Sequence, residues 1–164
     1  MIARRMPDAL KAAQIVLSVA AAIAIPSCHR RAAGPVVTLA HPNGLVLKVP
    51  EVIDGRGFAF VQTPAGFAYA DPRDVRTPTR GSVSFNPGVA TPAGDWPKTW
   101  LVRGRTIHYA VTEREGGSGG AEYELRAWET TRGGHIAYVE DEQSEWGPEW
   151  RVIRTIVDAT SAPP

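Results

Sequence analysis

Apolar and polar residues alternate along much of the second half of the chain, in the two-residue period of strands that are half buried. The segments 105–112, 121–129 and 134–141 show this alternation, and turn-forming residues separate them. Three such strands in succession favour antiparallel pairing. We therefore predict a three-stranded antiparallel meander with one buried and one solvent-facing side.

The first half predicts two hairpins. Segments 36–39 and 45–49 flank Asn43-Gly44, a pair that favours a tight turn, and segments 58–63 and 66–70 flank Pro64-Ala65. A loop over residues 71–80, a short strand at 82–85 and a connection rich in proline and glycine complete this half. We predict that this part of the chain also consists of short strands.

The last element has helical spacing. Trp150, Ile153, Ile156 and Val157 recur at intervals of three and four residues, and Pro148 suits a first helical turn. The segment 148–159 therefore predicts an amphipathic helix packed on the sheet, although its β-branched residues leave a terminal strand as the alternative. The predicted fold class is α+β and dominated by strands, an antiparallel meander with a C-terminal helix; the alternative is an all-β sandwich.

The N-terminus has the architecture of a secretory signal. Arg4, Arg5 and Lys11 precede an apolar run over residues 15–25, which is shorter than the roughly 20 residues that a membrane-spanning helix needs. We predict a signal peptide at residues 1–27, a tether at 28–35, a single domain at 36–160 and a short tail at 161–164.

The only cysteine, Cys28, directly follows this segment. The arrangement resembles the bacterial lipoprotein signal, which implies that the Cys28 thiol is acylated and anchors the protein. His29, rather than an aspartate, follows the cysteine, which implies anchoring at the outer membrane with the domain in the periplasm. The alternatives are an ordinary cleaved signal with an unrelated cysteine, or a core helix.

Charge is distributed unevenly. The chain has 18 basic and 17 acidic residues, of which the leader holds three and one, so the remainder has a net charge of −1. This balance gives no support for a nucleic-acid partner. Residues 71–114 hold seven bases and four acids, whereas residues 115–149 hold nine acids and two bases. The acidic half predicts either solvated strand faces or a surface that meets a cationic partner.

A glycine-rich segment separates the first two strands of the meander: Gly116, Gly117, Ser118, Gly119 and Gly120. It matches G-x-S-x-G, but a nucleophile elbow requires a strand followed by a helix, and here strands lie on both sides. We therefore do not predict an enzyme, and an esterase that uses Ser118 is the least favoured function. The segment predicts a flexible hairpin loop, or a loop that enters the cleft of another protein.

Other candidate sites give weaker signals. Glu140, Asp141, Glu142 and Glu145 could bind calcium, but their spacing matches no known calcium loop, and a solvated acidic run is the simpler interpretation. The histidines lack the spacing of metal ligands. His108 is interpreted as a strand residue, and Trp96 and Trp100 as packing residues. We predict no metal or cofactor of the protein's own.

Three stretches together carry a family resemblance. They are HPNGL at 41–45 with Val49-Pro50, Gln62-Thr63 with Gly66-Phe67, and EGGSGGAEYEL at 115–125 with Ala127-Trp128-Glu129. With the predicted lipoprotein signal, they resemble the periplasmic immunity lipoproteins of type VI secretion, specifically those that neutralise a secreted muramidase, an effector that cleaves peptidoglycan. The resemblance covers roughly residues 40–130.

The resemblance implies inhibition without catalysis, by loops that enter the substrate groove of the muramidase. It also implies that any calcium in the complex belongs to the effector. By position, we predict that the glycine loop and its flanks bind the effector: Glu115, Gly116, Gly117, Ser118, Gly119, Gly120 and Glu122. A second predicted group lies around the 58–70 hairpin: Pro64, Gly66, Phe67, Tyr69 and Asp71. The alternative function is a housekeeping envelope lipoprotein that acts as a binding or scaffold module.

Overall fold

The computed structural model describes residues 34–73, 79–89, 91–115 and 120–162, which belong to one compact unit, Ala32–Pro164. Strands dominate this unit, and α1 (Arg151–Ala159) is the only helix among these residues. The predicted strand-dominated α+β class is confirmed. The predicted signal peptide and Cys28 lie outside the described residues. In the described part of the chain, no helix is both long and apolar enough to cross a membrane.

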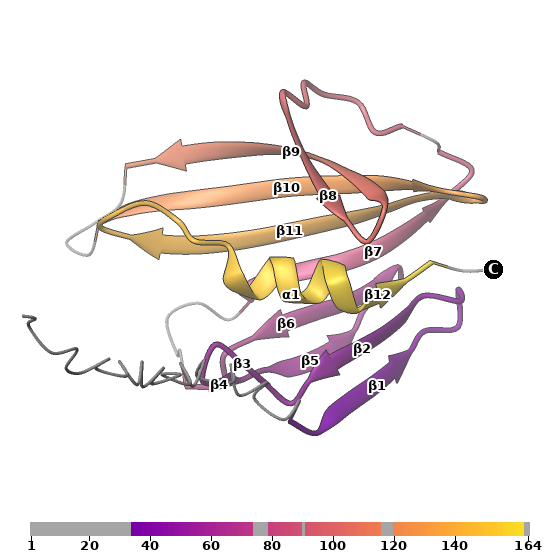
Figure 1. Ribbon diagram of the computed structural model, residues 1–164, viewed down its shortest axis with the longest axis horizontal. Coiled ribbons are helices and arrows are strands. Elements are labelled where there is room, and N and C mark those ends of the chain that lie inside the picture. The colour runs from indigo at the N-terminus through magenta and orange to yellow at the C-terminus, as the bar shows by residue number, and fades with distance from the viewer. Residues whose placement is uncertain (1–33, 74–78, 90, 116–119, 163–164) are drawn as a thin grey trace, which may run out of the picture. The chain divides into compact units, whose positions relative to one another are not determined.

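The larger sheet has seven antiparallel strands in the order β5-β6-β7-β11-β10-β9-β8. Its centre is the predicted meander, in which Leu125 of β10 lies opposite Val111 of β9 and Glu140 of β11. The strands are β5 (Ala59–Gln62), β6 (Gly66–Ala70), β7 (Gly81–Pro87), β8 (Lys98–Val102), β9 (Arg105–Arg114), β10 (Ala121–Thr131) and β11 (Gly134–Ser144). The prediction of an antiparallel meander is confirmed (Figure 1).

A smaller sheet contains β1 (Val36–Ala40), β2 (Val46–Pro50) and β12 (Thr160–Ser161), and β3 (Val52–Ile53) pairs separately with β4 (Arg56–Gly57). Both predicted hairpins form, β1 with β2 and β5 with β6. Their turns contact each other, because His41 Nε2 lies 2.9 Å from the Thr63 carbonyl oxygen and Asn43 Nδ2 donates to that of Ala65 at 2.9 Å. The two sheets are thus tied together at this end.

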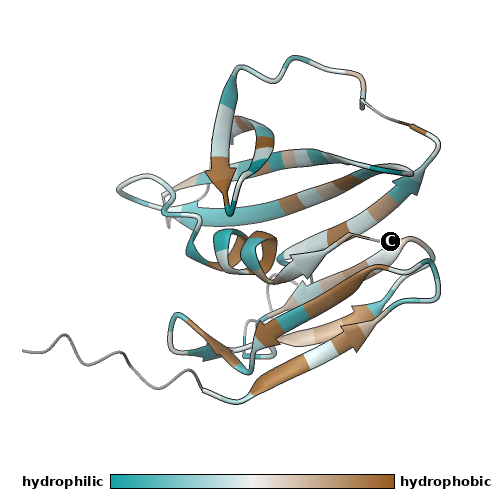
Figure 2. Ribbon diagram, turned by 45° about the vertical axis from the view of Figure 1, so that its right-hand side comes forward, coloured by the Kyte–Doolittle hydropathy of each residue, from teal (hydrophilic) through white to brown (hydrophobic). Residues whose placement is uncertain are grey.

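Helix α1 lies between the two sheets (Figure 1) and contacts β2 and β11. Its buried face consists of Val152, Ile153, Ile156 and Val157. These side chains join buried apolar residues of β2 and of the larger sheet in one core. Figure 2 shows in brown the hydrophobic segments of the strands and of α1. The predicted helix is confirmed, but it begins at Arg151 because Trp150 is left-handed (φ 55°). The terminal strand is limited to β12.

The outer face of the meander is not exposed to solvent along its whole length. Trp128 is 6% exposed and stacks on His108, with ring centroids 4.6 Å apart. Trp96, from the connection between β7 and β8, covers it edge-on at 6.3 Å. On the opposite, core-facing side, Trp100 stacks on Tyr109 at 4.3 Å. The prediction that Trp96 and Trp100 pack is confirmed, whereas the prediction of one solvent-facing side is wrong at Trp128, since a distant connection buries it.

Candidate functional site

The predicted glycine loop lies in the hairpin between β9 and β10, whose strands pair as far as Arg114 opposite Glu122. Gly116–Gly119 fall outside the described residues; the structure describes the chain up to Glu115 and again from Gly120. Antiparallel strands on both sides contradict the strand-to-helix elbow that a catalytic Ser118 requires. The hairpin interpretation is confirmed.

Gly120 fixes the base of this hairpin against the end of β11. Its φ of 98° lies in the left-handed region, and a Cβ atom there would meet the Ser144 carbonyl oxygen at 2.6 Å and Glu145 N at 2.8 Å. A side chain at this position would collide with backbone. The end of the sheet formed by the β9–β10 hairpin and the turn at residues 144–147 is called the hairpin end below.

The second predicted group, around the 58–70 hairpin, does not lie at the hairpin end. Gly66 is level with Trp128 across the sheet, whereas the glycine hairpin begins beyond Ala121. Phe67 and Tyr69 are 4% and 1% exposed, because they lie on the core-facing side of β6.

Two further members of that group are also inaccessible. Gly66 is buried, and a Cβ atom there would lie 2.1 Å from the Val83 carbonyl oxygen. Asp71 is 7% exposed and accepts hydrogen bonds from Arg73. Their burial argues against contact with an effector, as it does for Phe67 and Tyr69. Pro64 is the exposed member of this group.

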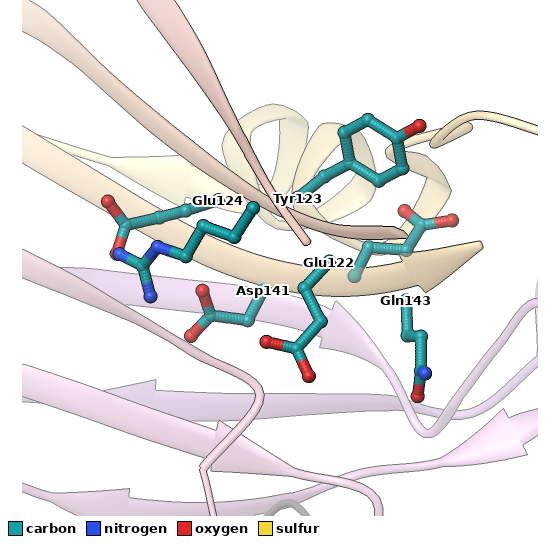
Figure 3. A pocket seen from close by; sticks show the side chains of 7 residues that line it. Glu122, Tyr123, Glu124, Asp141 and Gln143 are labelled. Atoms are coloured by element: carbon teal, nitrogen blue, oxygen red, sulfur yellow. The ribbon is translucent and has the colours of Figure 1, made fainter. Parts of the chain in front are cut away.

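A shallow pocket of about 220 Å³ lies next to the base of the glycine hairpin. Figure 3 shows Glu122, Glu124 and Asp141 on one side of the strands and Tyr123 directed to the other, as strand alternation requires. The residues that line it are Arg114, Glu122, Tyr123, Glu124, Asp141, Glu142 and Gln143. The predicted contact residue Glu122 is thus part of a group of carboxylates.

The charges of this pocket are only partly balanced. Glu124 pairs with Arg114 at 3.0 Å and with Arg126 at 2.7 Å. Among the described residues, neither Glu122 nor Asp141 has a salt-bridge partner. Partial burial, together with repulsion from Glu124 and Glu122, raises the pKa of Asp141. The pocket therefore favours a cationic group or a hydrogen-bond donor.

The acidic run on β11 is divided between the two faces of the strand. Glu140 is fully buried, pairs with Arg80 at 3.0 Å and accepts a hydrogen bond from Ile153 N at 2.8 Å. Burial raises the pKa of Glu140 to about 7. Glu142 accepts hydrogen bonds from the N–H groups of Glu149 and Trp150, which precede the helix. The solvated interpretation is wrong for Glu140, which is buried, whereas Glu142 is half-buried. Both residues hold the start of α1.

Metal binding has no support in this geometry. Over the described ranges, no group of three or more histidine, cysteine, aspartate or glutamate side chains is placed to hold a metal ion. His135 Nδ1 lies 2.6 Å from the Val89 carbonyl oxygen, and His108 stacks on Trp128, so both contact structural partners. The pocket beside the glycine hairpin is lined mainly by charged side chains.

Known proteins place this fold in a family. Residues 46–153 match the family described as the type six secretion immunity 3 domain, Tsi3. The immune protein Tsi3 of Pseudomonas aeruginosa is 34% identical over 110 residues, which cover 67% of this chain and 70% of that protein. This similarity favours immunity over the housekeeping alternative.

A solved structure shares the architecture at much lower identity. A crystal structure from Bacteroides thetaiotaomicron gives a TM-score of 0.52 at 14% identity, over 80% of this chain. The chain spans about half (49%) of that solved protein, and the likeness describes the fold alone. The match over residues 46–153 covers most of the described fold, and on that basis this chain belongs to the type VI secretion immunity 3 family.

Proposed function

We propose that this immunity protein binds a secreted peptidoglycan-cleaving muramidase in the periplasm and inhibits it by placing the hairpin end in its substrate groove. The proposal includes an outer-membrane anchor at lipidated Cys28. Family membership supports the immunity role, and the resemblance of the glycine-hairpin sequence supports the muramidase as its target. The structural observation that carries the proposal is the exposed, unbalanced negative charge beside the glycine hairpin.

The hairpin end has the properties of a surface that enters a groove. The glycine segment contributes backbone with almost no side chains, so its amide groups can approach the walls of a narrow cleft closely. Glu115 and Glu122, on either side of it, are exposed. Carboxylates on either side of a binding loop steer it toward a basic surface and fix its orientation there.

Calcium belongs to the partner in this proposal. The described part of the chain offers no group of ligands for it. Of the four residues that suggested a site, Glu140 and Glu142 contact Arg80 and backbone N–H groups instead. A calcium requirement of the complex would therefore follow the effector's own affinity for the ion. Calcium titration of the isolated immunity protein should give no heat of binding.

The direct test uses the full chain, extracted from membranes in mild detergent, and the muramidase encoded beside its gene. Capture of the muramidase is measured with calcium and with chelator, followed by peptidoglycan hydrolysis with increasing immunity protein. The proposal predicts tight capture and loss of hydrolysis at equimolar ratio. Capture without loss of hydrolysis would contradict groove occlusion, and no capture in either condition would contradict the muramidase as partner.

A double substitution tests the loop. Gly117→Leu with Gly119→Leu should weaken inhibition at least tenfold, because two bulky side chains obstruct entry into the groove. Gly57→Leu is the matched control, since Gly57 is exposed on β4 and only the Glu51 carbonyl oxygen lies within 4.0 Å of its Cβ position. Inhibition that survives the double substitution would exclude the glycine segment from the groove.

A further inference from the structure

The turn that follows β11 carries an exposed indole. Trp146 is 94% exposed, the highest value among the large apolar side chains that the structure describes. The other tryptophans of the described fold are buried or half-buried. A solvated indole adds nothing to the core, whereas a tryptophan offers a partner a large rigid apolar surface with one hydrogen-bond donor.

Hydrogen bonds hold this turn in place. Ser144 Oγ donates to the Gly147 carbonyl oxygen at 2.7 Å and accepts from Trp146 N at 3.3 Å. Directly after the turn, Glu142 accepts hydrogen bonds from Glu149 N at 3.2 Å and Trp150 N at 3.1 Å. The backbone on both sides of Trp146 is therefore fixed, and the indole is presented outward at low entropic cost to binding.

Trp146 shares the hairpin end with the charged pocket. Gly120 abuts the backbone of Ser144 and Glu145, directly before Trp146. Glu122 lies opposite Gln143, and Glu145 is exposed. The indole is therefore close to the glycine hairpin and to acidic side chains. An aromatic residue bordered by charges matches the composition of an interface hot spot with a polar rim.

We propose that Trp146 is the aromatic anchor of the effector interface, with its indole inserted into an apolar pocket of the muramidase that is rimmed by lysine or arginine. This inference rests on the proposed function and adds a contact residue outside the glycine loop. The apolar contact holds the complex together once it has formed, and the acidic side chains beside it accelerate encounter with the basic rim.

The test compares the affinities of the full chain and of Trp146→Ala for the muramidase, by biolayer interferometry in detergent. Trp146→Ala should weaken binding about 30-fold or more, mostly through faster dissociation, as truncation of a hot-spot residue does. Trp146→Phe should recover part of this loss. The control is Leu101→Ala, because Leu101 is 77% exposed on the edge strand β8 and should change affinity less than threefold.

Iodide quenching gives a second readout. The contribution of Trp146 to the fluorescence is obtained by subtracting the spectrum of Trp146→Phe from that of the full chain. Iodide should quench this contribution in the free protein and should quench it less in the complex. Binding by Trp146→Ala within threefold of the unaltered chain would overturn the anchor while leaving the proposed function intact. A full chain that does not bind the muramidase at all would overturn the proposed function, and the anchor with it.

Discussion

Glu140 and Asp141 are neighbours on β11, yet they belong to two different regions of the molecule. Glu140 faces the helix, where it is fully buried and bonded to Arg80 and Ile153, whereas Asp141 faces outward into the pocket and has no salt-bridge partner among the described residues. One strand therefore supplies both a structural carboxylate and a carboxylate that we propose takes part in recognition. The acidic residues of this half cannot be summed into a single surface charge, because strand alternation assigns them to opposite faces.

The structural face contains a second buried carboxylate. Glu129 is 3% exposed, accepts a hydrogen bond from Tyr138 Oη at 2.6 Å and pairs with Arg105 at 2.6 Å. Arg105 also donates to the Val157 carbonyl oxygen at 2.6 Å. Burial raises the pKa of Glu129. Glu140 thus contacts the first turn of α1, and Arg105, paired with Glu129, contacts its last turn.

The largest effect on stability is expected from Glu140→Ala. The substitution leaves Arg80 and Ile153 N without their acceptor, and removal of one partner from a buried ion pair costs about 3–5 kcal/mol. Asp141→Ala is the matched neighbour and should change the free energy of unfolding by less than about 0.5 kcal/mol. Urea unfolding measures both. Equal losses at the two positions would contradict the division between faces.

The dependence of the free energy of unfolding on pH should reveal the titration of the Glu140 carboxyl. Because burial raises the pKa of Glu140 to about 7, the native chain holds this proton more tightly than the unfolded chain, whose carboxyl titrates near 4.5. The contribution of Glu140 is therefore fully present below pH 4.5 and is lost as the pH rises toward 7. The loss is on the order of 3 kcal/mol.

Glu140→Gln isolates this contribution, because it removes the titrating group and keeps an acceptor. The free energy of unfolding of the unaltered chain, minus that of Glu140→Gln, should fall between pH 5 and pH 8. A difference that stays constant over this range would show that the Glu140 carboxyl does not titrate there.

A smaller effect on binding is expected on the recognition face. Glu122→Lys with Asp141→Lys should slow association with the muramidase about tenfold and reverse its dependence on salt, because steering charges act on encounter. Stability should change little, since neither side chain has a salt-bridge partner in the part of the chain that the structure describes. Glu51→Lys with Asp95→Lys, both exposed and outside the hairpin end, is the charge-matched control, because both double substitutions change the net charge by the same amount. An equal loss for that control would indicate that net charge, rather than the hairpin end, directs association.

Local sequence patterns predicted the strands and hairpins, but not the burial of every side chain on them. The meander follows from two-residue alternation, and the first hairpin from Asn43-Gly44. The same alternation places Glu140 in line with Ile136 and Tyr138 on the core face, a signal that the acidic composition of the run obscured. Phe67 and Tyr69 likewise alternate as core residues, although their closeness to a turn suggested exposure.

Other features depend on contacts between distant segments. Trp128 is buried because the connection at residues 88–97 brings Trp96 over it, and no local pattern specifies that path. The outward direction of Trp146 depends on two hydrogen bonds of Ser144 Oγ, which accepts from Trp146 N and donates to the Gly147 carbonyl oxygen. It also depends on Glu142, which fixes the residues after the turn. Sequence reasoning thus located the glycine hairpin but missed the indole beside it.

Hydrogen exchange of the full chain, alone and with the muramidase, tests most directly that the hairpin end is the binding surface. Binding through the hairpin end should slow exchange at residues 111–124 and 141–149, with little change at residues 59–70. Protection confined to residues 59–70, with the hairpin end unchanged, would contradict binding through this end.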